Sequence, residues 1–227
     1  MNLQWVEIIF QVVVFLFAIS VHESAHAWTA DRCGDPTARM LGRVTLNPLK
    51  HIDPWGTIVL PLIAIIMGFA VIGWAKPTPV NPRNFKNLMR DDILTSLAGP
   101  VSNLLVATAS VVLLAVISLV SSQGNMIVKA LAGYGAPLEL DTPLVPLCVL
   151  LYEAMIINVL LAVFNCIPVP PLDGSHVIRH FLSPGALRIY DMVGMFGIVI
   201  VFLIGGRIIG IMMAPFLNFF NSLLLRI

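Results

Sequence analysis

The chain has 227 residues, of which 58% are hydrophobic and 11% are charged, and its formal net charge is +1. A soluble domain carries about 25% charged residues, so this composition excludes an ordinary soluble globule and predicts that lipid solvates much of the surface. The near-neutral charge gives no reason to expect a nucleic-acid partner. The three cysteines are widely spaced, include no CxxC pair and predict no disulfide framework.

Long apolar segments occur, in chain order, at 8–30, 56–75, 93–120, 144–167 and 189–225. A helix that crosses a bilayer needs about 20 residues, so we interpret the last segment, with Gly205-Gly206-Arg207 near its middle, as two spans. The first segment has no basic region before it, and we expect a retained membrane helix rather than a signal peptide. Residues 76–92 contain several prolines and are expected to form an extended loop. We predict an all-α polytopic membrane protein, a single domain over residues 1–227 with about five full spans.

The run His22-Glu23-Ser24-Ala25-His26 lies in the first apolar segment. Residues i and i+4 share one face of a helix, so both histidines can point at one ion with Glu23 beside it. This HExxH spacing is typical of zinc proteases, in which the glutamate is the general base towards a zinc-bound water. The alternative is a pair of histidines that only hydrogen-bond between helices. Three ionisable residues so close together in a membrane segment favour a functional site instead.

A catalytic zinc site usually has three protein ligands, and no third ligand follows the motif closely. The candidates elsewhere are Asp35, His51, Asp53, Glu139, Glu153, Asp173, His176 and His180. Asp173 is favoured because it follows an apolar helix that three prolines bring to an end. A helix that ends within the membrane is tolerated where it lines a hydrated cavity, which suits an active site. Glu153 lies about 18 Å back along that helix. His176 and His180 are expected near the metal or at the surface, and His51 and Asp53 in a structured turn near the site.

Three motifs together resemble those of the site-2 protease family of intramembrane zinc metalloproteases. They are HESAH at 22–26, Gly99-Pro100-Val101-Ser102-Asn103 in a membrane segment, and Asn165…Pro168…Leu172-Asp173-Gly174, in the family's order. The resemblance implies one zinc ion per chain held by His22, His26 and Asp173, with Glu23 as the base and Asn165 beside the cleaved carbonyl. It also implies cleavage of transmembrane segments of other proteins, often in signalling. The chain has no room for the PDZ or CBS domain of better-studied members, and Asn103 is expected to pack between helices.

Because the metal ligands must meet at one depth, the helices over 8–30 and 144–167 must run in the same direction. One intervening segment therefore does not cross, and we predict that 56–75, which contains Gly56, Pro61, Gly68 and Gly73, is re-entrant. The ligand-bearing side then carries 11 of the 13 Lys and Arg residues, and the other side carries Lys129 and Arg207. This asymmetry predicts a prokaryotic plasma-membrane protein whose active site lies nearer the cytoplasmic face.

The sequence thus predicts a zinc metalloendopeptidase that acts on transmembrane protein substrates in the lipid bilayer. Glu23 takes a proton from the attacking water and Asn165 donates a hydrogen bond to the developing oxyanion. The loops at 76–92 and 168–171 are candidates for binding an extended substrate. The rival interpretation is a membrane metal-binding or transport protein, which has no evident need for Glu23 between the two histidines.

Overall fold

The computed structural model describes residues 3–66, 73–133, 142–194 and 196–227, and all regular structure in these ranges is helical. This confirms the predicted all-α class. The helices are α1 (Leu3–Cys33), α2 (Thr37–Met40), η1 (Pro48–Lys50), η2 (Pro54–Val59), α3 (Leu60–Ile66), η3 (Pro82–Asn84), α4 (Leu88–Val120), α5 (Ser122–Ala132), α6 (Leu144–Asn165), α7 (Asp173–Arg179), α8 (Pro184–Gly194) and α9 (Gly197–Arg226).

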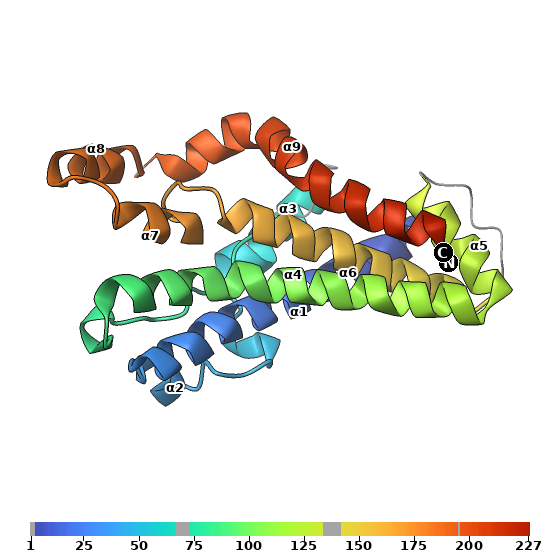
Figure 1. Cartoon of the computed structure of the whole chain (residues 1–227), viewed down its shortest axis with the longest axis horizontal. Helices are drawn as coiled ribbons and strands as arrows, with labels where there is room; N and C mark the ends of the chain where they lie inside the picture. The colour runs from blue at the N-terminus through green and yellow to red at the C-terminus, as the bar shows by residue number, and fades with distance from the viewer. Residues whose placement is uncertain (1–2, 67–72, 134–141, 195) are drawn as a thin grey trace.

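Four helices among the described residues, α1, α4, α6 and α9, are long and apolar enough to cross a membrane. α4 packs against both α1 and α6, and α9 packs against α6. Figure 1 shows α1 and α6 running in one direction, with α4 and α9 running in the other. The parallel course of α1 and α6 is the one that the meeting of the metal ligands requires.

The segment 56–75 begins and ends at the same place. The Trp74 amide donates to the Gly56 carbonyl at 3.1 Å, and the Thr57 hydroxyl donates to the Trp74 carbonyl at 2.8 Å. A side chain on Gly56 would place its Cβ 2.3 Å from Nε1 of Trp74, so only glycine permits this contact. The two ends of the segment are thus joined by hydrogen bonds and lie at the same end of the bundle. This agrees with the predicted re-entrant segment. Its residues 67–72 lie outside the described ranges.

The last apolar segment differs from the prediction of two spans. Residues 184–194 form the separate helix α8, and residues 197–226 form one continuous helix, about 45 Å long at 1.5 Å per residue. A glycine pair costs only about 1 kcal/mol per residue in a helix, which is too little to break an otherwise apolar one. α9 therefore ends at the same end of the bundle as the start of α1 (Figure 1), and Arg226 is in its last turn. Ten of the 13 Lys and Arg residues remain at the opposite end, where α2 and α7 lie.

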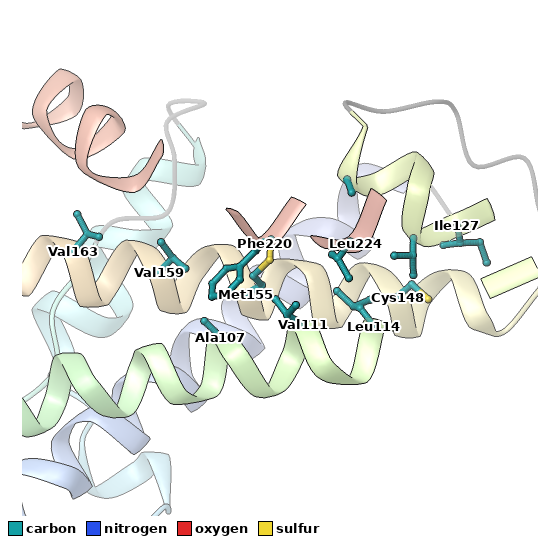
Figure 2. Packing of buried hydrophobic residues seen from close by; sticks show 12 residues of the cluster. Ala107, Val111, Leu114, Ile127, Cys148, Met155, Val159, Val163, Phe220 and Leu224 are labelled. Atoms are coloured by element: carbon teal, nitrogen blue, oxygen red, sulfur yellow. The ribbon is translucent and has the colours of Figure 1, made fainter. Parts of the chain in front are cut away.

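The hydrophobic core fills the half of the bundle near the chain termini. Its buried residues come from four helices, with Leu114 from α4, Ile127 from α5, Met155 from α6 and Leu224 from α9. Figure 2 shows these side chains around the ribbon of α6, with Leu114 on the side of α4, Leu224 under α9 and Ile127 beside α5. The core holds the helices together in this half and leaves their other ends to form the polar site.

The end of α6 and the start of α4 position polar residues at the end of the bundle away from the chain termini. α6 ends at Asn165, and the prolines at 168, 170 and 171 prevent the helix from continuing. Gly174, in the first turn of α7, packs so closely that a Cβ would lie 2.4 Å from the Cys166 carbonyl oxygen. The loop predicted over 76–92 is shorter than expected, because Asn87 Oδ1 accepts from the Arg90 amide at 3.0 Å and so caps α4, which starts at Leu88.

Candidate metal centre

Two histidines from α1 and one aspartate from α7 bring three ligand atoms together. His22 Nε2 and His26 Nε2 are 3.0 Å apart, and Asp173 Oδ2 lies 3.1 Å from the first and 3.3 Å from the second. Both histidines are buried. Among the described residues, this is the one group of three His, Cys, Asp or Glu side chains whose ligand atoms all lie within 4.8 Å. The site therefore brings together the three residues that the sequence analysis favoured.

The hydrogen bonds of the two imidazoles set which nitrogen carries the proton. His26 Nδ1 lies 2.7 Å from the Thr95 carbonyl oxygen, and His22 Nδ1 lies 2.6 Å from Asn103 Oδ1. Both oxygens only accept, so each Nδ1 donates and each neutral ring keeps a lone pair on Nε2. Such outer hydrogen bonds are the usual way in which metal-binding histidines are oriented.

The arrangement fits a divalent cation. Two nitrogen lone pairs and a carboxylate oxygen face one another at 3.0–3.3 Å and repel unless a positive charge lies among them. Asp173 Oδ2 is buried and has no hydrogen-bond partner among the described residues. Zinc binds histidine nitrogen and carboxylate oxygen at about 2.0–2.2 Å, a reach that suits ligand atoms at this spacing.

One face of α4 is shaped to receive this centre. Thr95, Gly99 and Asn103 recur every four residues and therefore lie along one side of the helix. A Cβ on Gly99 would lie 2.4 Å from His26 Nε2 and 2.5 Å from His22 Cε1. Gly99 is thus the residue that lets α4 approach both imidazoles.

Asn103 does more than the packing role expected for it. It is fully buried, and its Nδ2 donates to Asn158 Oδ1 at 2.8 Å and to the Ala18 carbonyl at 3.2 Å. These bonds join α1, α4 and α6 and also fix its Oδ1 towards His22. The spacing of Thr95, Gly99 and Asn103 was the sequence signal that could have linked them to the histidines.

Glu23 and Asn165 both line a cavity of about 410 Å³ that also reaches His22 and Asp173. Glu23 Oε2 accepts from the Thr78 amide at 2.8 Å and from the Thr78 hydroxyl at 2.6 Å. Asn165 Nδ2 donates to the Leu161 carbonyl in its own helix at 3.0 Å. Apolar side chains form much of the remaining wall, including Ile19, Leu161, Phe164, Trp74 and Leu172. Thr78 is a contact of the glutamate that the sequence analysis missed.

The candidate ligands between residues 35 and 53 have structural partners instead. Asp35 is buried and accepts from Asn84 Nδ2 and from the Asn81 amide, both at 2.7 Å. His51 is buried, with Nε2 2.8 Å from the Thr45 carbonyl. Asp53 caps η2 through the Gly56 amide at 2.8 Å. These residues build the structured turns that were expected near the site.

The later candidates lie away from the three ligands. His180 Nε2 is 2.7 Å from Asp92 Oδ2, and His176 Nδ1 is 3.7 Å from Asp92 Oδ1. These contacts join α7 to the first turns of α4. Glu153 lies in the middle of α6, and Glu139 lies outside the described residues.

Comparisons with known proteins agree with this geometry. The family model described as Peptidase family M50 matches residues 10–204. A protein of Bacillus subtilis (strain 168) named "Putative zinc metalloprotease YwhC" is 38% identical over 175 residues, which cover 77% of this chain and 69% of that protein. A protein of Mycolicibacterium smegmatis named "Putative zinc metalloprotease Rip2" is 28% identical over 188 residues, covering 82% of this chain and 62% of its own length. No solved structure gives a significant match.

The family match covers most of the chain, including both histidines, the glutamate and the aspartate. The chain therefore belongs to peptidase family M50, the site-2 protease family, and is a zinc metalloprotease with apolar, membrane-crossing helices.

Proposed function

We propose that this protease hydrolyses peptide bonds within or near transmembrane segments of other membrane proteins. The observation that carries the proposal is the position of His22, His26 and Asp173, whose ligand atoms converge within 3.3 Å between helices that are apolar enough to cross a membrane. A soluble substrate cannot reach a site at that depth as readily as a segment that already lies in the lipid.

His22, His26 and Asp173 are the residues that would hold one zinc ion per chain. When bound, zinc would polarise the scissile carbonyl and lower the pKa of its bound water to near neutral. Glu23, on the same helix turn and lining the same cavity, takes the proton from the attacking water and passes it to the leaving amine. Asn165 turns its Nδ2 from the Leu161 carbonyl towards the developing oxyanion, a contact worth about 3 kcal/mol in other proteases.

The cavity supports an extended, apolar substrate. A helical segment hides its carbonyls in its own hydrogen bonds, so it must unwind before Glu23 and Asn165 can act on it. Residues from two chain segments, which lie in or next to the predicted substrate-binding loops, help to line the cavity: Gly73, Trp74, Ala75, Pro77, Pro171 and Leu172. Apolar side chains such as Ile19 and Phe164 give the unwound segment a surface that resembles the lipid it leaves.

We further propose that the protein lies in a bacterial plasma membrane with its active site nearer the cytoplasm. Ten of the 13 Lys and Arg residues lie at the ligand-bearing end, which the positive-inside rule assigns to the cytoplasm. Trp28, Trp55 and Trp74 are all exposed and suit anchors at that interface. The relatives named above are bacterial, which agrees with this location.

The test is cleavage by the purified chain in liposomes of a pool of peptides, each with one apolar segment of about 20 residues. Wild type, Glu23→Gln and the control Glu7→Gln, at the other end of α1, are compared for bound zinc and for products by mass spectrometry. We expect Glu23→Gln to keep zinc and lose cleavage, while Glu7→Gln keeps both. Cleavage that survives Glu23→Gln contradicts the proposal, and zinc uptake into liposomes that survives it supports a transporter instead.

A further inference from the structure

We propose that Thr78 is a positioning residue for this reaction: it holds the carboxylate of Glu23 in place so that one oxygen faces the cavity. The inference rests on the proposed role of Glu23 as the base. It concerns a residue outside the HExxH, GPVSN and proline-aspartate motifs, on the chain that follows the re-entrant segment.

Two hydrogen-bond donors of Thr78, its amide and its hydroxyl, face Glu23. The Thr78 amide donates to Glu23 Oε2 at 2.8 Å, and the Thr78 hydroxyl lies 2.6 Å from the same oxygen and 3.0 Å from the Glu23 carbonyl. The amide and the hydroxyl of Thr78 both contact Oε2 of the Glu23 carboxylate. Oε1 is therefore the oxygen left to accept a proton from water in the cavity. A glutamate side chain has three rotatable bonds, and two bonds from one residue restrict them together.

The backbone around Thr78 is constrained by its neighbours in sequence. Pro77 and Pro79 flank it, so the proline ring fixes φ on one side and the X-Pro link keeps Thr78 in extended conformations on the other. Little ordering is then needed for the Thr78 amide and hydroxyl to reach Glu23. The Pro-Thr-Pro sequence thus suits a residue that must be held in one position.

Buried polar groups also fasten the chain just before Thr78. The Lys76 amide donates to the His51 carbonyl at 2.8 Å. The buried guanidinium of Arg43 donates through Nη2 to the Lys76 carbonyl and, at 3.3 Å, to the Pro77 carbonyl. These bonds come from the loop after α2 and hold residues 76 and 77 against it. Thr78 therefore projects from a fixed support rather than from a free loop.

The competing interpretation is that Thr78 only fastens residues 74–77, of which Trp74, Ala75 and Pro77 line the cavity. One of the other bonds that hold that segment runs from the Thr57 hydroxyl to the Trp74 carbonyl at 2.8 Å. Thr57→Val removes this bond and leaves Thr78 on Glu23. It is the matched control, because it loosens the same segment by the same chemical change without touching the base.

The experiment measures kcat and KM for Thr78→Val, Thr78→Ala, Thr78→Ser and Thr57→Val in liposomes, on those pooled peptides that wild type cleaves. Bound zinc and the melting temperature are recorded for each variant. We expect Thr78→Val and Thr78→Ala to keep zinc and to lower kcat by about 10-fold, at the lower end of the effect of losing an orienting partner. Thr78→Ser is expected to restore kcat, and Thr57→Val to change KM alone.

A kcat for both Thr78→Val and Thr78→Ala that equals or exceeds that of wild type overturns the inference, as does an equal loss of kcat in Thr57→Val. Where wild type cleaves and Glu23→Gln does not, either of these two kcat results rejects the role of Thr78 but leaves the proposed function standing. If Glu23→Gln cleaves as well as wild type, the proposed function fails and this inference fails with it.

Discussion

Gly99→Ala adds one methyl group at the closest approach between α4 and the metal centre. The new Cβ would lie 2.4 Å from His26 Nε2, 2.5 Å from His22 Cε1 and 2.6 Å from His22 Nε2, and ordinary contact begins at 3.4 Å. The rings or the helix must therefore move by about 1 Å, whereas a zinc site tolerates only about 0.2 Å in its ligand distances. We expect zinc affinity to fall at least about 10-fold to 100-fold.

Helix propensity works in the opposite direction, which makes the substitution informative. Alanine is favoured over glycine in a helix by about 1 kcal/mol, so α4 itself gains stability from the change. Gly210→Ala in α9 is the control, because nothing lies within 4 Å of its added Cβ. Zinc affinity is measured by competition with a chelator in detergent. Wild-type affinity in Gly99→Ala, with Gly210→Ala also unchanged, would refute the account of how α4 meets the histidines.

Three further changes test the surroundings of the site. Asn103→Ala removes the acceptor for a metal-facing imidazole and should weaken zinc binding by about 10-fold or more, measured by equilibrium dialysis; unchanged binding would leave Asn103 a packing residue only. Asp35 is buried, which works to raise its pKa, but hydrogen bonds from its neighbours lower the pKa below the ordinary value of 3.8. The ionised Asp35 therefore stabilises the fold fully above that pH, and this stabilisation is lost as the pH falls through the lowered pKa. The melting temperature of Asp35→Asn should depend less on pH below 4 than that of wild type does, and an equal dependence would contradict this. Cysteines placed at the exposed positions of Leu46 and Arg83 should react from one side of the membrane and a cysteine at Lys129 from the other; labelling of positions 46 and 83 from opposite sides would exclude a re-entrant segment.

The sequence predicted the elements whose signals are local. HExxH in an apolar helix identifies two residues on one helix face, and a proline-broken helix end followed by Asp173 identifies a third near the membrane surface. The re-entrant segment followed from a constraint rather than from hydropathy, since two ligand-bearing helices must run in the same direction. The bond between the Trp74 amide and the Gly56 carbonyl agrees with that argument.

The remaining features depend on contacts between residues far apart in the chain. Glu23 and Thr78 are 55 residues apart, and His22 and Asn103 are 81 residues apart. No local pattern specifies which side chain will meet another across two helices or a loop. The continuous α9 was missed for a different reason. The apolar segment over 189–225 is too long for one span and was divided at its glycine pair, but the small cost of glycine does not interrupt a helix surrounded by apolar residues.

The most direct test of the central claim is the zinc content and coordination of the purified chain and of Asp173→Ala, with Asp191→Ala as control. Asp191 is an exposed carboxylate on α8, away from the three ligands. We predict about one zinc ion per chain in wild type and in Asp191→Ala, with X-ray absorption showing two histidine nitrogens and carboxylate oxygen as protein ligands. Asp173→Ala should bind zinc at least about 10-fold more weakly. Zinc bound by Asp173→Ala with wild-type affinity and coordination would contradict the three-ligand centre.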